Sequence, residues 1–277
     1  MRRSSSQIRL FLLLAFGFSW TIWIPMALLG VVVRPGMLPT HFGGLLRPWV
    51  AGSVCVLVSA PKAARAAWLR RLIGLPQGVR GWLLALTPFL LIAVFGAAAA
   101  WMCHPIEAIA LLRFSGLPVL PPLALFAVVL VVNGYGEEAG WRGYLLPRLQ
   151  ARYGAIGGVL AQAAIWIVWH APLFWIVATY RGMGPAMLVF GFGLGLVLGG
   201  FVLAQVSAAS RGSVLAAALW HTGYNFGTAT DGGALLQAGL SAIVMTWGAA
   251  LLLRALLSPA GWRAITVPDF DKRRAGP

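Results

Sequence analysis

The sequence predicts an all-α membrane protein, a polytopic bundle of about eight transmembrane helices with both termini in the cytoplasm. Three observations predict this class. Hydrophobic residues make up 60% of the 277 residues and charged residues only 10%, which excludes an ordinary soluble domain. Several apolar runs of roughly 18 residues or more are long enough to cross a bilayer. The basic residues behind the net charge of +15 lie between these runs, so they indicate membrane topology and no nucleic-acid partner.

Eight apolar runs follow one another, separated by polar, basic or Pro- and Gly-containing residues. The first run follows a basic start but is too long for a signal peptide. The second is short, so seven helices with a re-entrant second segment remain an alternative. The fourth begins at two prolines, which suit the first turn of a helix. The runs cover residues 8–33, 48–60, 82–102, 121–152, 156–178, 185–206, 214–228 and 234–257.

The distribution of Lys and Arg orients the bundle. With eight spans and a cytoplasmic N-terminus, only Arg34, Arg47, Arg113 and Arg181 of the 21 basic residues fall on the opposite side. The other 17 are cytoplasmic, as the positive-inside rule requires. We therefore expect residues 1–277 to form a single integral-membrane domain, multi-pass and in a bacterial plasma membrane.

Two adjacent carboxylates stand out at the end of the fourth run's apolar part. The chain has only six Asp and Glu residues, and Glu137 and Glu138 are two of them. An ionisable residue inside a membrane is costly to bury, so it marks a functional site. Glu138 and Arg142 are four residues apart, share a helix face and are expected to pair. The helix period rotates Glu137 about 100° away, so it points elsewhere.

Two further pairs of side chains are spaced by one helical turn. Trp166 and His170 lie in the fifth run, where the indole is expected next to the imidazole. His221 and Asn225 lie in the seventh run and are expected to face one cavity together.

Depth along the helices makes one shared site feasible. At 1.5 Å per residue, Glu137 and His170 lie about 22 Å and 21 Å from the cytoplasmic ends of their helices, and His221 about 10 Å from its own. All three positions fall inside the membrane. His41 and His104 fall in loops on the opposite side and are not expected to join them.

This set of groups can carry out hydrolysis. A desolvated Glu137 suits a general base near neutral pH, and His170 could orient or deprotonate the same water. His221 and Asn225 could donate hydrogen bonds to a developing oxyanion. Alternatively, Glu137, His170 and His221 could hold zinc, because two His, one Glu and a water form a known catalytic shell. The helical zinc signature His-Glu-x-x-His is absent. We therefore expect that the site requires no cofactor, and zinc remains the alternative.

The three motifs together resemble one family of membrane proteins. Glu137-Glu138-x-x-x-Arg142, Trp166-x-x-x-His170 and His221-x-x-x-Asn225 are similar, in this order and on separate helices, to the CAAX protease and bacteriocin-processing (CPBP, Abi) family of intramembrane proteases. The family includes the type II CAAX prenyl endopeptidases. One departure is visible, since the family usually has Phe where this chain has Trp166.

The resemblance implies a protease core at residues 121–228 and a role for each motif residue. Glu137 would match the catalytic glutamate, with His170 assisting it. His221 and Asn225 would match the pair that stabilises the oxyanion. Glu138 and Arg142 would match residues that hold the site in shape.

The resemblance further implies a CAAX prenyl endopeptidase-like enzyme that is glutamate-dependent or, as the family was long described, a metalloendopeptidase. Its partners would be the lipid bilayer and a membrane-associated protein or peptide, such as a prenylated CAAX-type substrate, reached from the cytoplasmic side. Two other classes stay open. One is a non-catalytic membrane protein of the bacteriocin-immunity or interaction type. The other is a proton-coupled transporter, because buried Glu and His can also relay protons.

Overall fold

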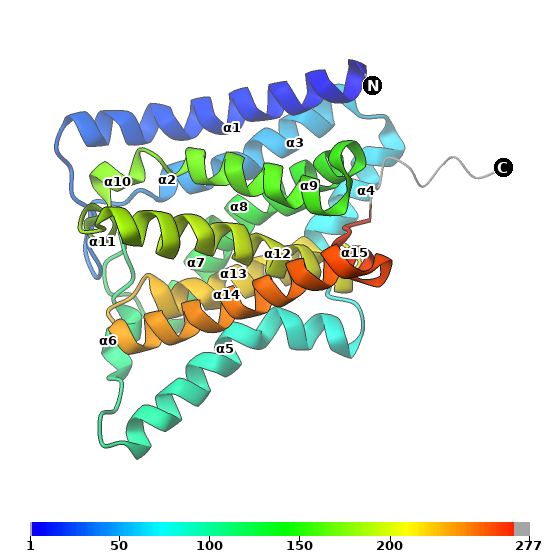
Figure 1. The fold of residues 1–277 in the computed structure, drawn as a ribbon. Coiled ribbons are helices and arrows are strands. Elements are labelled where there is room, and N and C mark those ends of the chain that lie inside the picture. The colour runs from blue at the N-terminus through cyan, green and yellow to red at the C-terminus, as the bar shows by residue number, and fades with distance from the viewer. Residues whose placement is uncertain (1, 269–277) are drawn as a thin grey trace.

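The computed structural model describes residues 2–268, and this part of the chain is a bundle of helices (Figure 1). Within it there is no strand, only three isolated bridges between loops. The predicted all-α polytopic class is therefore confirmed. Among the described residues, six segments are long and apolar enough to cross a membrane: Ser6–Leu28, Phe42–Ser59, Gly78–Trp101, Pro122–Ile176, Met187–Ala209 and Ala234–Leu257.

The helices follow the chain in an order close to the predicted runs. The first half contains α1 (Arg2–Leu28), α2 (Phe42–Leu45), α3 (Arg47–Ser59), α4 (Lys62–Ile73), α5 (Gly78–Trp101), α6 (Ala108–Leu112) and α7 (Pro122–Val129). A broken central run follows, made of η1 (Leu130–Tyr135), α8 (Gly136–Glu138), η2 (Ala139–Leu145) and α9 (Leu146–Trp169). The rest contains α10 (Leu173–Ile176), α11 (Ala178–Arg181), η3 (Met187–Gly193), α12 (Leu194–Ala209), α13 (Val214–Thr228), α14 (Ala234–Leu257) and α15 (Pro259–Ile265).

Two features relate these helices to the eight predicted runs. The 55-residue segment Pro122–Ile176 contains two runs, because the chain turns at Gly154 with φ +77°, a conformation that glycine adopts without strain. The seventh predicted run coincides with α13, which has 15 residues and is shorter than a typical span. Eight passes therefore remain our prediction for the intact membrane protein.

The prediction of one continuous fifth helix over residues 156–178 is wrong. α9 ends at Trp169, His170 is its C-cap, and a turn leads into the short α10. Pro172 lies in this turn, and a proline cannot donate the backbone hydrogen bond that would continue a helix. The broken end is stabilised from α1, since Trp20 Nε1 donates to the Trp169 carbonyl oxygen at 3.1 Å.

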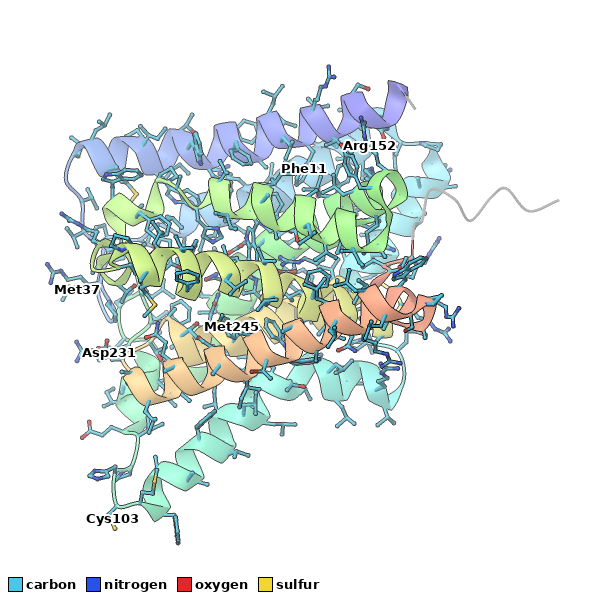
Figure 2. All side chains as sticks on the ribbon, viewed as in Figure 1. Phe11, Met37, Cys103, Arg152, Asp231 and Met245 are labelled. Atoms are coloured by element: carbon cyan, nitrogen blue, oxygen red, sulfur yellow. The ribbon has the colours of Figure 1, made fainter. Side chains whose placement is uncertain are left out.

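The two ends of the bundle carry different residues. α1 begins and α14 ends at the right-hand end in Figure 1, where α4 and α15 also lie. Arg152 lies towards this end, whereas Met37 and Asp231 lie at the other (Figure 2). Which of these two ends faces the cytoplasm stays a prediction. Three of the basic residues counted as cytoplasmic, Lys272, Arg273 and Arg274, lie outside the described residues.

Close backbone contacts place the central run in the middle of the bundle. A Cβ added to Gly134 in η1 would lie 2.7 Å from the Ala218 carbonyl oxygen of α13. One added to Gly140 in η2 would lie 2.4 Å from the Pro48 carbonyl oxygen of α3. Small residues are what allow helix backbones to approach this closely in membranes. The Glu pair between these two glycines is thereby fixed in the interior.

Candidate active site

The helix turn that carries the two glutamates is irregular on both sides. The three residues of α8 are flanked by the π-helical segments η1 and η2. Such π-helical turns are rare and occur often at functional sites. Glu137 is 2% exposed and Glu138 is fully buried. Buried carboxylates require polar or charged partners, and each of these has its own set.

Glu138 accepts two hydrogen bonds at the same oxygen. Arg142 Nη1 donates to Glu138 Oε1 at 2.9 Å, so the pair expected from the four-residue spacing forms. His221 Nδ1 lies 2.8 Å from the same Oε1. Because a carboxylate oxygen accepts, Nδ1 is the protonated nitrogen, and Nε2 takes no part in this bond. Glu138 therefore holds both the guanidinium and the imidazole of a different helix.

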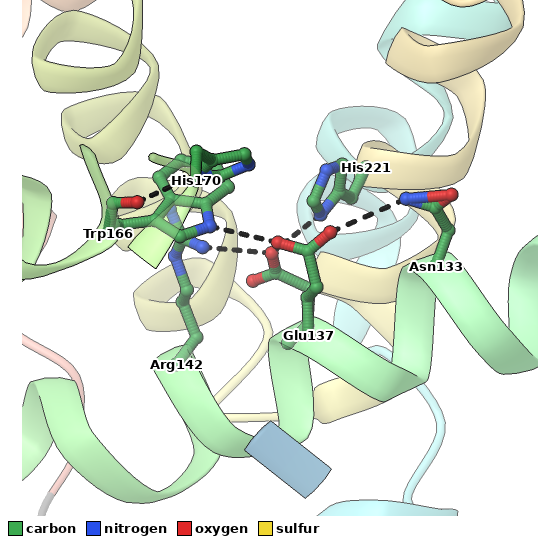
Figure 3. A network of polar contacts seen from close by, with 7 residues as sticks. Asn133, Glu137, Arg142, Trp166, His170 and His221 are labelled. Atoms are coloured by element: carbon green, nitrogen blue, oxygen red, sulfur yellow. Dashed lines mark hydrogen bonds and ion pairs between the residues drawn. The ribbon is translucent and has the colours of Figure 1, made fainter. Parts of the chain in front are cut away.

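Glu137 points in another direction, as the helix period predicted, and it also has two donors (Figure 3). Trp166 Nε1 donates to Glu137 Oε2 at 2.8 Å. Asn133 Nδ2 donates a longer hydrogen bond to Oε1 at 3.4 Å. The guanidinium carbon of Arg142 lies 4.2 Å from the centroid of the Trp166 ring. A phenylalanine at position 166 could stack on Arg142 but could not donate to Glu137.

His170 faces the site from the end of α9. Its Nδ1 lies 2.7 Å from the Trp166 carbonyl oxygen and so carries the proton, which leaves Nε2 to exchange one. Its ring packs edge-on against Trp166 and against Phe192, with centroids 5.5 Å and 5.4 Å away. In Figure 3, His170 and His221 lie on opposite sides of the carboxylates. The structure thus brings both predicted histidines to the Glu pair.

The depth of His221 follows from where α13 begins. A Cβ on Gly143 would lie 3.0 Å from Val214 Cγ2, so α13 begins at the level of Gly143. Gly143 is five residues beyond Glu138, about 7.5 Å along the helix. His221 is seven residues into α13, about 10 Å from its first residue. His221 lies only about 10 Å from the start of its helix, yet at the level of the glutamates, because α13 itself begins inside the bundle.

The site concentrates charge away from water. Two carboxylates face one guanidinium, and a doubly protonated His221 would balance them. Unbalanced buried charge is strongly destabilising, which favours such a balance. Among the described residues, Glu138 Oε2 and Arg142 Nε and Nη2 have no hydrogen-bond partner.

The two asparagines near the site differ in what they contact. Asn225 is half-buried one turn beyond His221, and its side chain makes no hydrogen bond within the described part of the chain. Asn133, which we did not predict as a site residue, contacts Glu137 instead. Its position four residues before Glu137 is a signal that could have identified it. Phe192 lies on η3, and no sequence pattern connects it to His170.

The alternative zinc site can be tested against the donor atoms. In the described residues, no group of three His, Cys, Asp or Glu side chains is arranged to hold a metal ion. Both oxygens of Glu137 accept hydrogen bonds, and the Nδ1 atoms of His170 and His221 face protein oxygens. A histidine that binds zinc through Nε2 makes the same Nδ1 hydrogen bonds, so the zinc alternative stays a prediction.

Comparison with known proteins shows which family this site resembles. Residues 119–227 match the family described as type II CAAX prenyl endopeptidase Rce1-like. Residues 119–227 thus resemble an Rce1-like domain. This domain includes all three motifs, so the resemblance to the CPBP family of proteases is confirmed. CAAX prenyl protease 2 of Methanococcus maripaludis is 28% identical over 88 residues, which are 31% of this chain and 32% of that protein. The chain thus aligns with about a third of the length of this relative.

Proposed function

We propose that the protein is an intramembrane endopeptidase that hydrolyses a peptide bond of a membrane-associated substrate, such as a prenylated CAAX-type peptide. The observation that supports this most is the buried pairing of two differently held carboxylates with two histidines. Glu137, Glu138, His170 and His221 come from three separate helices and are all at most 6% exposed. The Rce1-like match covers the same residues.

Glu137 and His170 form the half of the site that we propose to activate water. Trp166 and Asn133 orient the Glu137 carboxylate, which accepts a proton from the attacking water. His170 Nε2 assists by accepting a hydrogen bond or by passing the proton to the leaving amine. Because the carboxylate is already oriented and shielded from bulk solvent, little reorganisation is needed when the bound water attacks.

His221 forms the other half and stabilises the charge that develops on the substrate. With Nδ1 bonded to Glu138, a doubly protonated His221 can donate from Nε2 to the tetrahedral oxyanion. Asn225 can add a second donor if its side chain turns towards the site when substrate binds. Arg142 holds Glu138 in place as the positioning partner of His221.

The test uses purified full-length protein in detergent and a fluorogenic farnesylated peptide. We compare wild type with Glu137→Gln, each with and without a strong chelator. The matched control is Glu107→Gln, since Glu107 is an exposed carboxylate in a distant loop. We expect cleavage to fall by at least about 100-fold in E137Q, to persist in E107Q and to be unaffected by the chelator.

Three other outcomes correct the proposal in different ways. Equal cleavage by E137Q and wild type removes Glu137 from catalysis. Loss on chelation that zinc restores makes Glu137 and the histidines metal ligands in the active enzyme. Absence of cleavage in wild type, on prenylated and unprenylated peptides alike, favours a non-catalytic membrane protein of the bacteriocin-immunity type.

A further inference from the structure

A cavity of about 730 Å³ lies at the end of the bundle where the chain begins, apart from the glutamate site. It is lined by residues of α1, α4, α9 and the turn after α12. Four of the lining residues are arginines, and the described lining contains no Asp or Glu. The arginines are Arg70, Arg71, Arg148 and Arg211. The cavity therefore has a strongly positive lining drawn from three elements.

Two of the arginines are buried and fixed by the protein. Arg71 is 8% exposed; it donates to the Gly143 carbonyl oxygen at 3.3 Å and to the Pro268 carbonyl oxygen. Arg148 donates to the Tyr144 carbonyl oxygen at 2.8 Å. These bonds hold two guanidinium groups in place and join the cavity to the helix that carries Glu138. They form a rigid positive floor.

The other two arginines are exposed at the rim. Arg70 lies on α4, and Arg211 lies in the turn that ends α12. Arg211 has φ 54°, in the left-handed region, and the turn is closed by a hydrogen bond from Gly212 N to the Ser207 carbonyl oxygen. Both exposed guanidinium groups can therefore bind an anion that enters from outside, because neither has to leave a buried partner to do so.

The surface beside the cavity is apolar, which favours one kind of anion. Leu75 lines the cavity and is 62% exposed, and Leu69 and Ile73, on α4 just outside the lining, are 55% and 70% exposed. α4 lies at the end of the bundle in Figure 1, near the level at which membrane head groups are expected. Arginines beside exposed leucine and isoleucine suit a phosphate attached to acyl chains better than a soluble anion.

We propose that this arginine cavity binds the phosphate head group of an anionic phospholipid, with the acyl chains lying along the apolar side of α4. The site is independent of the proteolytic function proposed above. The predicted orientation supports it, because this end carries most of the basic residues and anionic lipids attract such surfaces.

The test counts lipids that stay bound to the full-length protein. Protein in detergent is mixed with equal amounts of phosphatidylglycerol and phosphatidylcholine. Native mass spectrometry then measures the masses of the protein–lipid complexes. The variant is Arg70→Gln with Arg211→Gln, both exposed positions. The matched control is Arg34→Gln with Arg181→Gln, which removes the same charge at the opposite end. Circular dichroism and gel filtration check that all proteins are folded.

We expect wild type and the control to retain phosphatidylglycerol in preference to phosphatidylcholine. The R70Q/R211Q variant should bind it about 30-fold more weakly, since each arginine near an anionic head group contributes about a fivefold effect. Equal loss in both variants would mean a general charge effect and overturn the proposal. Displacement by glycerol 3-phosphate alone would assign the cavity to a soluble phosphate. Binding only after residues 269–277 are removed would assign it to the chain's own tail.

Discussion

The central run and α5 are both apolar helices, yet they occupy opposite environments. α5 has the higher mean hydropathy of the two, but only 17% of its most apolar window is buried inside the protein, against 50% for Pro122–Ile176. In a membrane, an apolar side chain gains little by leaving lipid for protein, so polar and small residues mark the interior. The glycines and glutamates of the central run therefore identify the buried helix better than its hydrophobicity does.

The largest expected effect comes from breaking the buried ion pair. Arg142→Met leaves Glu138 with only His221, so the free energy of unfolding should fall by about 3–5 kcal/mol. Leu90→Ala, on α5 where the side chain is 55% exposed, should change it by about 0.5 kcal/mol or less. Steric trapping in bicelles measures both. Equal stability of R142M and wild type would show that the pair is not what holds the interior together.

The next effect concerns a buried histidine just outside the spans. Burial lowers the pKa of His41 from its ordinary 6.5 to about 4. The unfolded chain then binds a proton before the folded protein does, so this stability is complete above pH 6.5 and is lost as the pH falls towards 4. The loss should reach about 3 kcal/mol, and His41→Gln should remove this pH dependence.

The control for His41 is His104→Gln, because His104 lies exposed in a loop at the same end. Thermal unfolding at a series of pH values compares the three proteins. A pH dependence that persists unchanged in H41Q would assign the acid sensitivity to another group.

Trp166 tests whether the indole acts on Glu137 beyond filling space. Trp166→Phe removes the hydrogen bond to the carboxylate, which is worth about 1.5–3 kcal/mol for a charged acceptor. We expect kcat/KM for the peptide to fall by about 10- to 100-fold, and the acid limb of the pH–rate profile to move to higher pH. Trp82→Phe, on the lipid-facing α5, should leave both unchanged. A fall in activity without any change of the pH profile would indicate a packing role only.

The smallest effect contrasts two glycines. Gly134→Ala forces a Cβ against the Ala218 carbonyl oxygen, so the free energy of unfolding should fall by about 1–3 kcal/mol. Gly96→Ala on α5 meets nothing within 4 Å and should be neutral or stabilising by up to about 1 kcal/mol. The same substitution is thus expected to have opposite signs in the two helices. Equal signs would contradict the contrast between them.

Contacts within one helix were predictable from the sequence. Glu138 with Arg142 and Trp166 with His170 are four residues apart, and both pairs are in contact in the structure. The period of the helix fixes which side chains share a face, whatever surrounds it. By the same rule Asn133, four residues before Glu137, could have been assigned to it.

Contacts between helices were not predictable in the same way. The bonds from Trp166 to Glu137 and from His221 to Glu138 depend on how far each helix is rotated and how deep it begins. The π-helical segments beside α8 change that rotation, and α13 begins at the level of Gly143. Nothing in the spacing of His221 and Asn225 indicated that only His221 would reach the carboxylates.

The sequence by itself determined the membrane class, most helix positions and the motifs, because bilayer thickness and the cost of buried charge act on every segment separately. The tertiary structure alone decided that each glutamate has its own partners, that a proline turn places His170 at a helix end, and that four arginines surround one cavity. These depend on how the helices pack against one another, which brings together residues far apart in the chain.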